Sequence, residues 1–188
     1  LFSEKEELEM MLWGERDLDN GAWTKLYDID LFDDIRYPVG MLYEDTATTY
    51  KIFAKCDNIA VVSVPIYNYM IRNDSITQCE FNLKKLQIID ATKVMSDDVR
   101  KRYPELNDGC DRKMLWAYFS TLSQLASSNT KNRDIERQLI DYIKSNYKCV
   151  LNNKRTPKRD KFGIISLFFG YKFYKFIWNL YKKMQKKY

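Results

Sequence analysis

The chain has 188 residues, of which 45% are apolar, 30% charged and 15% aromatic, and this composition excludes a disordered polymer. The chain has only 6 Gly and 4 Pro, and this low content disfavours a turn-dense β-sandwich or barrel. It has no His, which excludes a His general base, a Ser-His-Asp triad and a His-ligated metal. The net charge of +5 hides a split, because residues 148–188 hold 12 Lys or Arg and one acid, whereas residues 1–147 are net −6. An acidic body therefore carries a strongly basic tail.

Five segments of the first half have distinct patterns. Residues 3–13 predict a helix, because a capping Ser and first-turn Glu residues precede apolar side chains at helical spacing, and Asn20-Gly21 is expected to end it. Residues 22–40 are expected to be irregular. Residues 44–56 have a helical apolar face with an Asp near the start that could cap it. The β-branched run at 59–66 predicts a short strand that continues as an edge strand.

The second half of the chain is predicted to be helical. The three helices expected before the tail span 82–103, 112–127 and 133–147, with the stretch around Pro104, Asn107 and Gly109 separating the first two. A polar loop at 152–161 precedes a final aromatic segment. The predicted fold class is therefore mainly α with a small β element (α+β).

The first residue and the cysteines bear on processing and metal binding. The chain begins with Leu1 and a charged helical pattern, which predicts a segment cut from a longer protein. Without His, a zinc site would need four thiolates to meet from distant points of the chain, and no C-x-x-C pair is present. We therefore expect no metal site in this segment and four reduced, mostly buried cysteines in a cytosolic protein: Cys56, Cys79, Cys110 and Cys149.

The basic tail has the pattern of a helix that lies in a membrane interface. Its last 27 residues contain ten aromatic side chains, but its longest uncharged run has only ten residues, where a membrane span needs about 20. On a helical projection the lysines share one arc and apolar residues fill much of the remainder. The predicted membrane-surface residues are Lys172, Lys175, Trp178, Lys182, Lys183 and Lys186.

Basic aromatic helices also serve other purposes. The tail could instead pack on the body or on a second copy, bind a calmodulin-like partner, or bind nucleic acid. We expect an anionic membrane surface and no nucleic acid, and a homo-oligomer is compatible with the pattern.

A series of short motifs lies between residues 22 and 76. In chain order they are Trp23-Thr24-Lys25-Leu26-Tyr27, Leu31-Phe32, Tyr37-Pro38-Val39-Gly40, Glu44-Asp45 and Tyr67-x-Tyr69-x-x-Arg72-x-x-Ser75-Ile76. This order resembles the second half of bacterial family 2 glycosyltransferases of the GT-A type, in the capsular and cell-surface polysaccharide branch. That branch reads W-N-K-L-Y, L-F, F-P-x-G, E-D and Y-x-Y-R-x-R-x-x-S-I. Thr24 and Met70 depart from it, at its Asn and its first Arg.

The resemblance implies that the chain has three regions and that the first half of the enzyme lies outside it. Residues 1–78 would be the acceptor-side remainder of the catalytic domain, 79–150 a helical C-terminal region, and 151–188 a basic loop with an amphipathic aromatic helix. The family's nucleotide-sugar domain, whose D-x-D motif holds Mg²⁺ or Mn²⁺ on the diphosphate, would precede this segment. Asp17-Leu18-Asp19 matches D-x-D by letters only, because no strand leads into it.

The acidic pair is the candidate catalytic site. Inverting glycosyl transfer needs a carboxylate that takes the proton of the acceptor hydroxyl, and a carboxylate at a helix start after a Gly-containing turn is accessible to substrate. The resemblance implies that Asp45 is the general base and Glu44 a neighbour that contacts the acceptor or orients the loop. From the residues alone, a helix N-cap pair is the favoured interpretation, and the flanking motifs reverse that preference.

Three further residues are candidates for substrate binding. The Trp23 face could stack on a sugar ring and Lys25 could neutralise phosphate charge, although core packing and a surface lysine are the simpler readings. Arg72, matching the second Arg of the family motif, would pair with the donor diphosphate.

The resemblance predicts the C-terminal part of an inverting hexosyl transferase that uses a nucleotide diphosphate sugar and a hydroxyl of a cell-surface glycan. The enzyme would be cytoplasmic and peripheral at the inner face of the membrane, and this segment alone would be inactive. The alternative is a non-catalytic helical interaction module that its basic aromatic tail anchors to a membrane or partner.

Overall fold

A computed structural model of the chain describes residues 1–15, 20–65, 67–68, 70 and 79–185, and these residues form a mainly helical protein. This confirms the expected dominance of helix. The helices in the described residues, with η marking 3-10 helices, are α1 (Glu4–Trp13), η1 (Ile29–Phe32), α2 (Glu44–Phe53), η2 (Leu83–Leu86), α3 (Gln87–Arg102), η3 (Pro104–Leu106), α4 (Asn107–Ser127), α5 (Arg133–Asn152), α6 (Lys158–Phe168) and α7 (Tyr171–Gln185).

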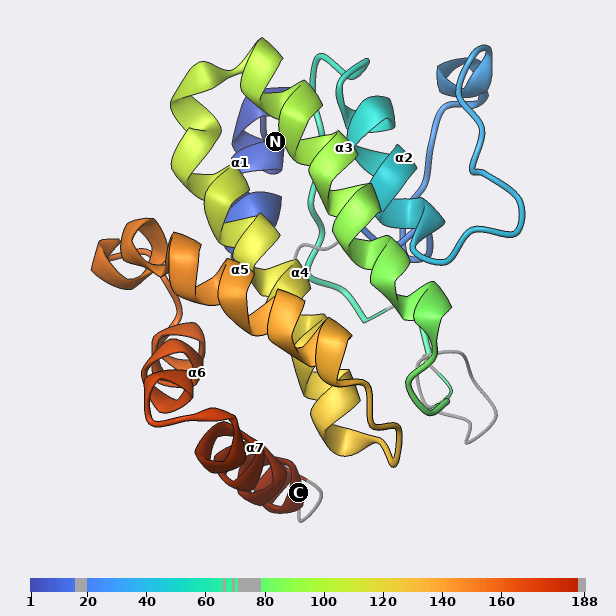
Figure 1. The fold of residues 1–188 in the computed structure, drawn as a ribbon. Coiled ribbons are helices and arrows are strands. Elements are labelled where there is room, and N and C mark those ends of the chain that lie inside the picture. Colours follow the sequence, from blue (N-terminus) through green and yellow to red (C-terminus); the bar gives the residue numbers. More distant parts are fainter. Residues whose placement is uncertain (16–19, 66, 69, 71–78, 186–188) are drawn as a thin grey trace.

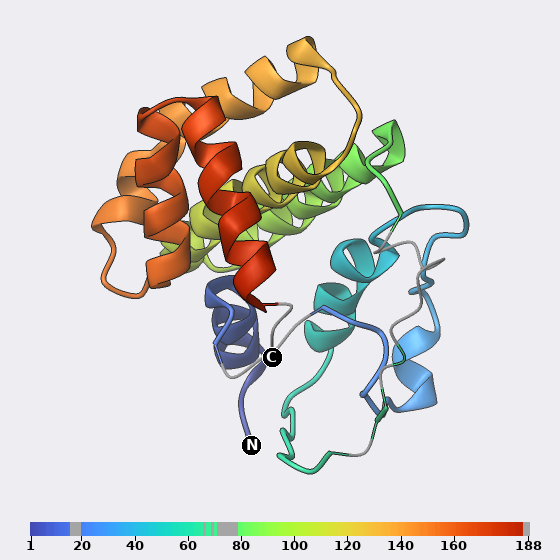
Figure 2. The same cartoon turned by 90° about the horizontal axis from the view of Figure 1, so that it is seen from below.

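Helix α4 is the centre of the arrangement. Helices α1, α3 and α5 pack against it, and α2 packs against α3 (Figure 1). Helices α6 and α7 pack on each other, with α6 against α5 and α7 against α4. Both views place the α6–α7 pair on one side of α4, and α2 with the irregular segment 20–40 on the other (Figures 1 and 2).

Two clusters of buried apolar side chains hold the helices together. The first joins α1, α2, α3 and the start of α4, and its buried members are Leu8, Met11, Leu12, Tyr50, Phe53, Met95, Val99, Leu106 and Cys110. The second joins α4, α5, α6 and α7, and includes Leu115, Leu122, Leu139, Ile143, Ile164, Leu167 and Tyr174. The predicted regions 1–78 and 79–150 therefore share the first core.

Both ends of α1 follow the prediction of a helix over residues 3–13. Ser3 and Glu6 form a reciprocal capping box at the start. The helix ends at Trp13 because Gly14 adopts a left-handed conformation, with φ of 66°. The residue that stops the helix is therefore Gly14 and not the expected Asn20-Gly21.

Helix α4 starts five residues before the predicted position because a glycine inside it has a packing role. Gly109 was expected to separate two helices, yet it lies in the first turn of α4. A Cβ atom at this position would lie 3.1 Å from Leu12 Cβ and 3.2 Å from Trp13 Nε1. The glycine thus permits α1 and α4 to approach closely. The cost is a lower helix propensity than another residue would have at this position.

The predicted strand at 59–66 is wrong for the residues that the structure describes. Ile59 makes an isolated antiparallel bridge with Phe2, with N–O distances of 2.8 and 2.9 Å, and residues 60–65 continue without strand pairing. Val62 and Val64 are exposed. Strand propensity expresses how well a side chain fits a half-buried sheet, and the described part of the chain offers no partner strand to build one.

The cysteines are less buried than expected. All four are free among the described residues, but only Cys110 is fully buried and Cys56 is half-buried. Cys79 and Cys149 are exposed. The prediction of mostly buried cysteines is therefore wrong.

A buried ion pair joins the tail to the body. The Arg112 side chain on α4 is almost fully buried, and its Nη2 and Nε lie 2.8 and 3.2 Å from Asp160 Oδ2 on α6. Its Nη1 donates to the carbonyl of Leu12, 2.9 Å away, at the end of α1. A single guanidinium thereby connects α1, α4 and α6.

The charge split of the sequence also has a structural counterpart. Arg155, in the loop before α6, pairs with Glu9 and Glu15 and lies 4.9 Å from the centre of the Trp13 ring. The basic tail is thus bound to the acidic body by charge as well as by apolar packing.

Candidate functional site

The acidic pair lies in the first turn of α2, as predicted. Gly40 and Tyr43, with φ of 77° and 61°, turn the chain sharply before Glu44. Tyr43 occupies the N-cap position, so the expected capping role of Asp45 is wrong. The Asp45 Oδ1 atom instead accepts a 2.6 Å hydrogen bond from the backbone N–H of Thr46. Both carboxylates are half-buried at a helix N-terminus, where backbone N–H groups favour negative charge.

The segment before Trp23 and the Tyr37 motif meet on the buried side of α2. Asn20 donates through Nδ2 to Thr46 Oγ1 at 3.0 Å, and Thr49 donates to the Asn20 carbonyl at 2.6 Å. The Tyr37 hydroxyl lies 3.1 Å from Thr49 Oγ1. These hydrogen bonds fix the segment before Trp23, and the turn before Gly40, against the helix that carries Glu44 and Asp45.

Trp23 is not a core residue. Its side chain is 41% exposed and packs against the ring of Tyr67, with ring centres 5.2 Å apart and planes at 34°. The pair therefore joins the first motif to the last one. An exposed aromatic face of this kind can stack on a sugar ring.

Position 24 has an unusual backbone. Thr24 has φ of 61°, a left-handed conformation that is strained for a β-branched residue and well tolerated by Asn. Asn is the residue that the resembling glycosyltransferase branch carries at this point. Backbone strain of this kind clusters at functional sites.

Lys25 lies beside a buried acid that the sequence analysis did not single out. Its Nζ donates to the Gly21 carbonyl at 2.6 Å. Glu7 on α1 is only 2% exposed, and its Oε2 has no hydrogen-bond partner among the described residues. Burial raises the pKa of Glu7, and the nearby Lys25 charge offsets part of that rise. The available signal was a Glu on the same helical face as the buried Met10 and Met11.

Glu7→Gln should stabilise the protein at neutral pH. Because burial raises the pKa of Glu7, the folded state binds more protons than the unfolded state above about pH 4. Stability therefore falls as the pH rises through the folded pKa. We expect the Gln variant to lose this slope and to gain about 1 kcal/mol in free energy of unfolding at pH 7, measured by urea unfolding from pH 4 to 8.

The neighbouring acid provides the matched control. Hydrogen bonds from Ser3 lower the pKa of Glu6, so Glu6 stabilises the fold above its unfolded pKa and that contribution is lost as the pH falls. Glu6→Gln should bring no gain at pH 7. Parallel pH profiles for Glu7→Gln and the parent chain would refute this account of Glu7.

The remaining predicted residues lie either outside the described part of the chain or on α7. Arg72, the Asp17-Leu18-Asp19 sequence and Lys186 lie outside the described residues, so their roles stay predictions. Lys172, Lys182 and Lys183 are exposed, and Lys175 is half-buried.

In residues 1–15, 20–65, 67–68, 70 and 79–185, no group of three or more Cys, Asp or Glu is placed to hold a metal ion.

Trp178, one of the predicted membrane-surface residues, packs on the body of the protein. Its indole N–H donates to Ser127 Oγ at the end of α4, 3.2 Å away, and its ring packs on the second core. The outward apolar face of α7 is a different stripe, in which every side chain is at least 43% exposed. We call it the α7 stripe, and its members are Phe173, Phe176, Leu180 and Met184.

Comparison with known proteins gives a partial similarity. A stretch of 57 residues is 32% identical to the glycosyltransferase GlyA of Streptococcus pneumoniae serotype 4 (strain ATCC BAA-334 / TIGR4), and it covers 30% of this chain and 8% of that protein. The similarity is to a glycosyltransferase. The chain thus matches only a small part of its relative's length. No family model matches the chain, and no solved structure does.

Proposed function

We propose that the chain is the C-terminal part of an inverting family 2 glycosyltransferase of the GT-A type. It would transfer a hexose from a nucleotide diphosphate sugar to a hydroxyl of a cell-surface glycan, as in capsule synthesis. The observation that carries the proposal is the assembly around α2, where Asn20 and Tyr37 bind Thr46 and Thr49 beside the acidic pair. The partial similarity to a glycosyltransferase supports the same class of reaction.

Each residue has a distinct role in the proposed reaction. Asp45 takes the proton of the acceptor hydroxyl as its oxygen attacks the anomeric carbon, and Glu44 contacts the acceptor. Trp23 stacks on a sugar ring, whereas Lys25 and Arg72 face the phosphate charge of the donor. Mg²⁺ or Mn²⁺ would be held by a D-x-D motif in a separate nucleotide-sugar domain of the intact enzyme.

The proposal is tested with the full-length gene product. It should release nucleoside diphosphate from a nucleotide sugar in an acceptor-dependent manner, and NMR of the product should show an inverted anomeric centre. The 188-residue chain alone should release none. A full-length protein without a preceding α/β domain, or one that turns over no nucleotide sugar, would favour the non-catalytic helical module instead.

The tail supports a proposal for location at the inner face of an anionic membrane. None of the described helices is long and apolar enough to cross a bilayer. The α7 stripe instead presents an exposed apolar face, and the lysines Lys172 and Lys183 lie next to it on the helix. This arrangement suits a helix that lies in the plane of a membrane surface.

Removing the α7 stripe should weaken membrane binding. The double variant Phe176→Ser/Leu180→Ser should bind vesicles containing phosphatidylglycerol at least roughly tenfold more weakly in a sedimentation assay, because two apolar side chains no longer enter the interface. Leu83→Ser is the matched control, since Leu83 is a similarly exposed leucine on η2. Equal binding by the double variant and the control would contradict the membrane role of α7.

A further inference from the structure

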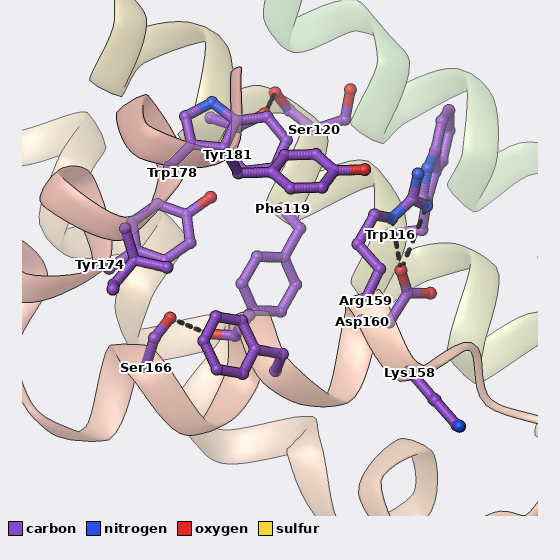
Figure 3. A pocket seen from close by; sticks show the side chains of 14 residues that line it. Trp116, Phe119, Ser120, Lys158, Arg159, Asp160, Ser166, Tyr174, Trp178 and Tyr181 are labelled. Carbon is purple, nitrogen blue, oxygen red and sulfur yellow. Dashed lines mark hydrogen bonds and ion pairs between the residues drawn. The ribbon is translucent and has the colours of Figure 1, made fainter. Parts of the chain in front are cut away.

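Helices α4, α6 and α7 surround a cavity of about 650 Å³ that the candidate active site does not use. Figure 3 shows the rings of Phe119, Tyr174, Trp178 and Tyr181 turned toward it. Its volume falls within the range of small-molecule sites, roughly 300–1,000 Å³. The cavity is large enough for a ligand, and α6 and α7, which line it, lie on the opposite side of α4 from α2 (Figures 1 and 2).

The cavity has a fixed shape. Tyr174 is buried and lies parallel to Tyr171 and Trp178, at ring distances of 6.2 and 6.4 Å. The hydrogen bond from Trp178 to Ser127 holds the ring against α4. The walls are therefore packed side chains, consistent with a preformed site.

Two serine hydroxyls in the walls donate to carbonyl groups of their own helices. Ser123 donates to the Ser120 carbonyl at 2.9 Å, and Ser166 donates to the Gly163 carbonyl at 2.8 Å. A sugar or a nucleotide in this mostly apolar cavity would leave several of its polar groups without partners, which is costly. The lining thus favours a hydrocarbon.

Charged side chains border one end of the cavity. Lys158, Arg159 and Asp160 lie at one side of it, away from Tyr174 (Figure 3). Asp160 is bound by the buried Arg112 and also by Arg159. With three cations and one anion, this end carries a net charge of +2, which suits a phosphate group.

Exposed apolar side chains continue from the edge of the cavity. Phe162 lines the cavity and is 56% exposed, and Ile165 on α6 and the C-cap residue Phe169 follow it at helical spacing, both exposed. We propose that this cavity binds the hydrocarbon chain of an anionic phospholipid, with its phosphate beside Lys158 and Arg159. The proposal goes beyond glycosyl transfer and does not depend on it.

The test uses soluble lipid with a single chain. Myristoyl lysophosphatidylglycerol, kept below its critical micelle concentration, should bind the 188-residue chain saturably and change its tryptophan fluorescence, because Trp116 and Trp178 both line the cavity. The lauroyl form has two methylenes fewer and should bind roughly tenfold more weakly. Lysophosphatidylcholine of the same length and Lys158→Gln should each weaken binding several-fold.

A glycine in the wall permits a filling variant that does not threaten the fold. A Cβ atom at Gly163 on α6 would make ordinary contact with the Phe119 ring at 3.4 Å, and leucine is a better helix former than glycine. Gly163→Leu should therefore fold at least as stably and bind the lysolipid at least roughly tenfold more weakly. Gly163→Ala, which is too small to fill the cavity, is the matched control and should bind normally.

Separate outcomes distinguish this site from the α7 stripe. Phe176→Ser/Leu180→Ser should keep its affinity for the soluble lysolipid while losing vesicle binding. Unchanged affinity in Gly163→Leu would overturn the proposal, as would equal affinity for the choline headgroup. A ligand-free dimer that Gly163→Leu dissociates in sedimentation equilibrium would also overturn it, by assigning the cavity to a second copy of the chain.

Discussion

Replacing Asp45 with Asn in the full-length protein should lower its turnover number by about two to four orders of magnitude, the usual contribution of a positioned general base. The substitution removes the proton acceptor and retains the oxygen that accepts the hydrogen bond from the Thr46 N–H. The structural role of the side chain is therefore preserved. Nucleotide release under saturating donor and acceptor measures the turnover number.

Two other acids between residues 22 and 76 supply the controls. Glu44→Gln should reduce turnover less than Asp45→Asn, because Glu44 is assigned to acceptor contact. Asp28→Asn changes a carboxylate in the same segment that also accepts a backbone hydrogen bond, from Asp30 N–H at 3.1 Å, and should leave turnover unchanged. Near-normal turnover of Asp45→Asn with an unchanged melting temperature would reject Asp45 as the base.

The helical content of the fold could be predicted because its signals are local. The cap at Ser3 and Glu6 spans four residues, and the sequence prediction for it was confirmed. The start of α4 could not be found in this way, because Gly109 is a glycine that packs against Leu12 and Trp13, about a hundred residues away. A turn glycine and a packing glycine look the same in a sequence.

The strand prediction failed for a related reason. The run after Ile59 has the side chains of a buried strand, yet a strand exists only when a second segment pairs with it. In the described residues, Phe2 provides pairing for one residue. The residue types indicated a preference for strand. No strand formed among the described residues because no second segment pairs with this one.

The candidate site was predictable as a set of motifs but not as an arrangement. The order of the motifs placed the Trp23 segment and the acidic pair in one region. The contacts that join them involve Asn20 and the threonines Thr46 and Thr49, across 26 and 29 residues, and none of these side chains is unusual in the sequence. Hydrogen bonds of this kind become visible only after the chain has folded.

The sequence pattern of the tail did not separate the two apolar faces of α7. On a helical projection, Tyr174 and Trp178 belong to the same broad apolar arc as Phe173 and Phe176. In the structure the first two pack toward α4 and the others face outward. Helix α7 therefore has one apolar face that packs on the body and a second apolar face that is exposed.

Removing the carboxylate of Asp160 should destabilise the protein by about 3–5 kcal/mol, the usual cost of leaving one partner of a buried ion pair alone. The Asp160→Ala variant would leave the Arg112 guanidinium buried with the Leu12 carbonyl as its remaining described partner. Urea unfolding followed by circular dichroism measures the loss. Asp141→Ala, which breaks the exposed Arg137–Asp141 pair on α5, should cost less than about 1 kcal/mol.

The double variant Arg112→Met/Asp160→Leu separates the cost of an isolated charge from the value of the pair. Apolar side chains of similar size often replace a buried ion pair without loss of stability, so this variant should recover most of the stability that Asp160→Ala loses. A loss in Asp160→Ala no larger than in Asp141→Ala would contradict the buried pair. Because Arg112 is the link from α4 to α6, hydrogen exchange in Asp160→Ala should accelerate in α6 and α7 before it does in α3.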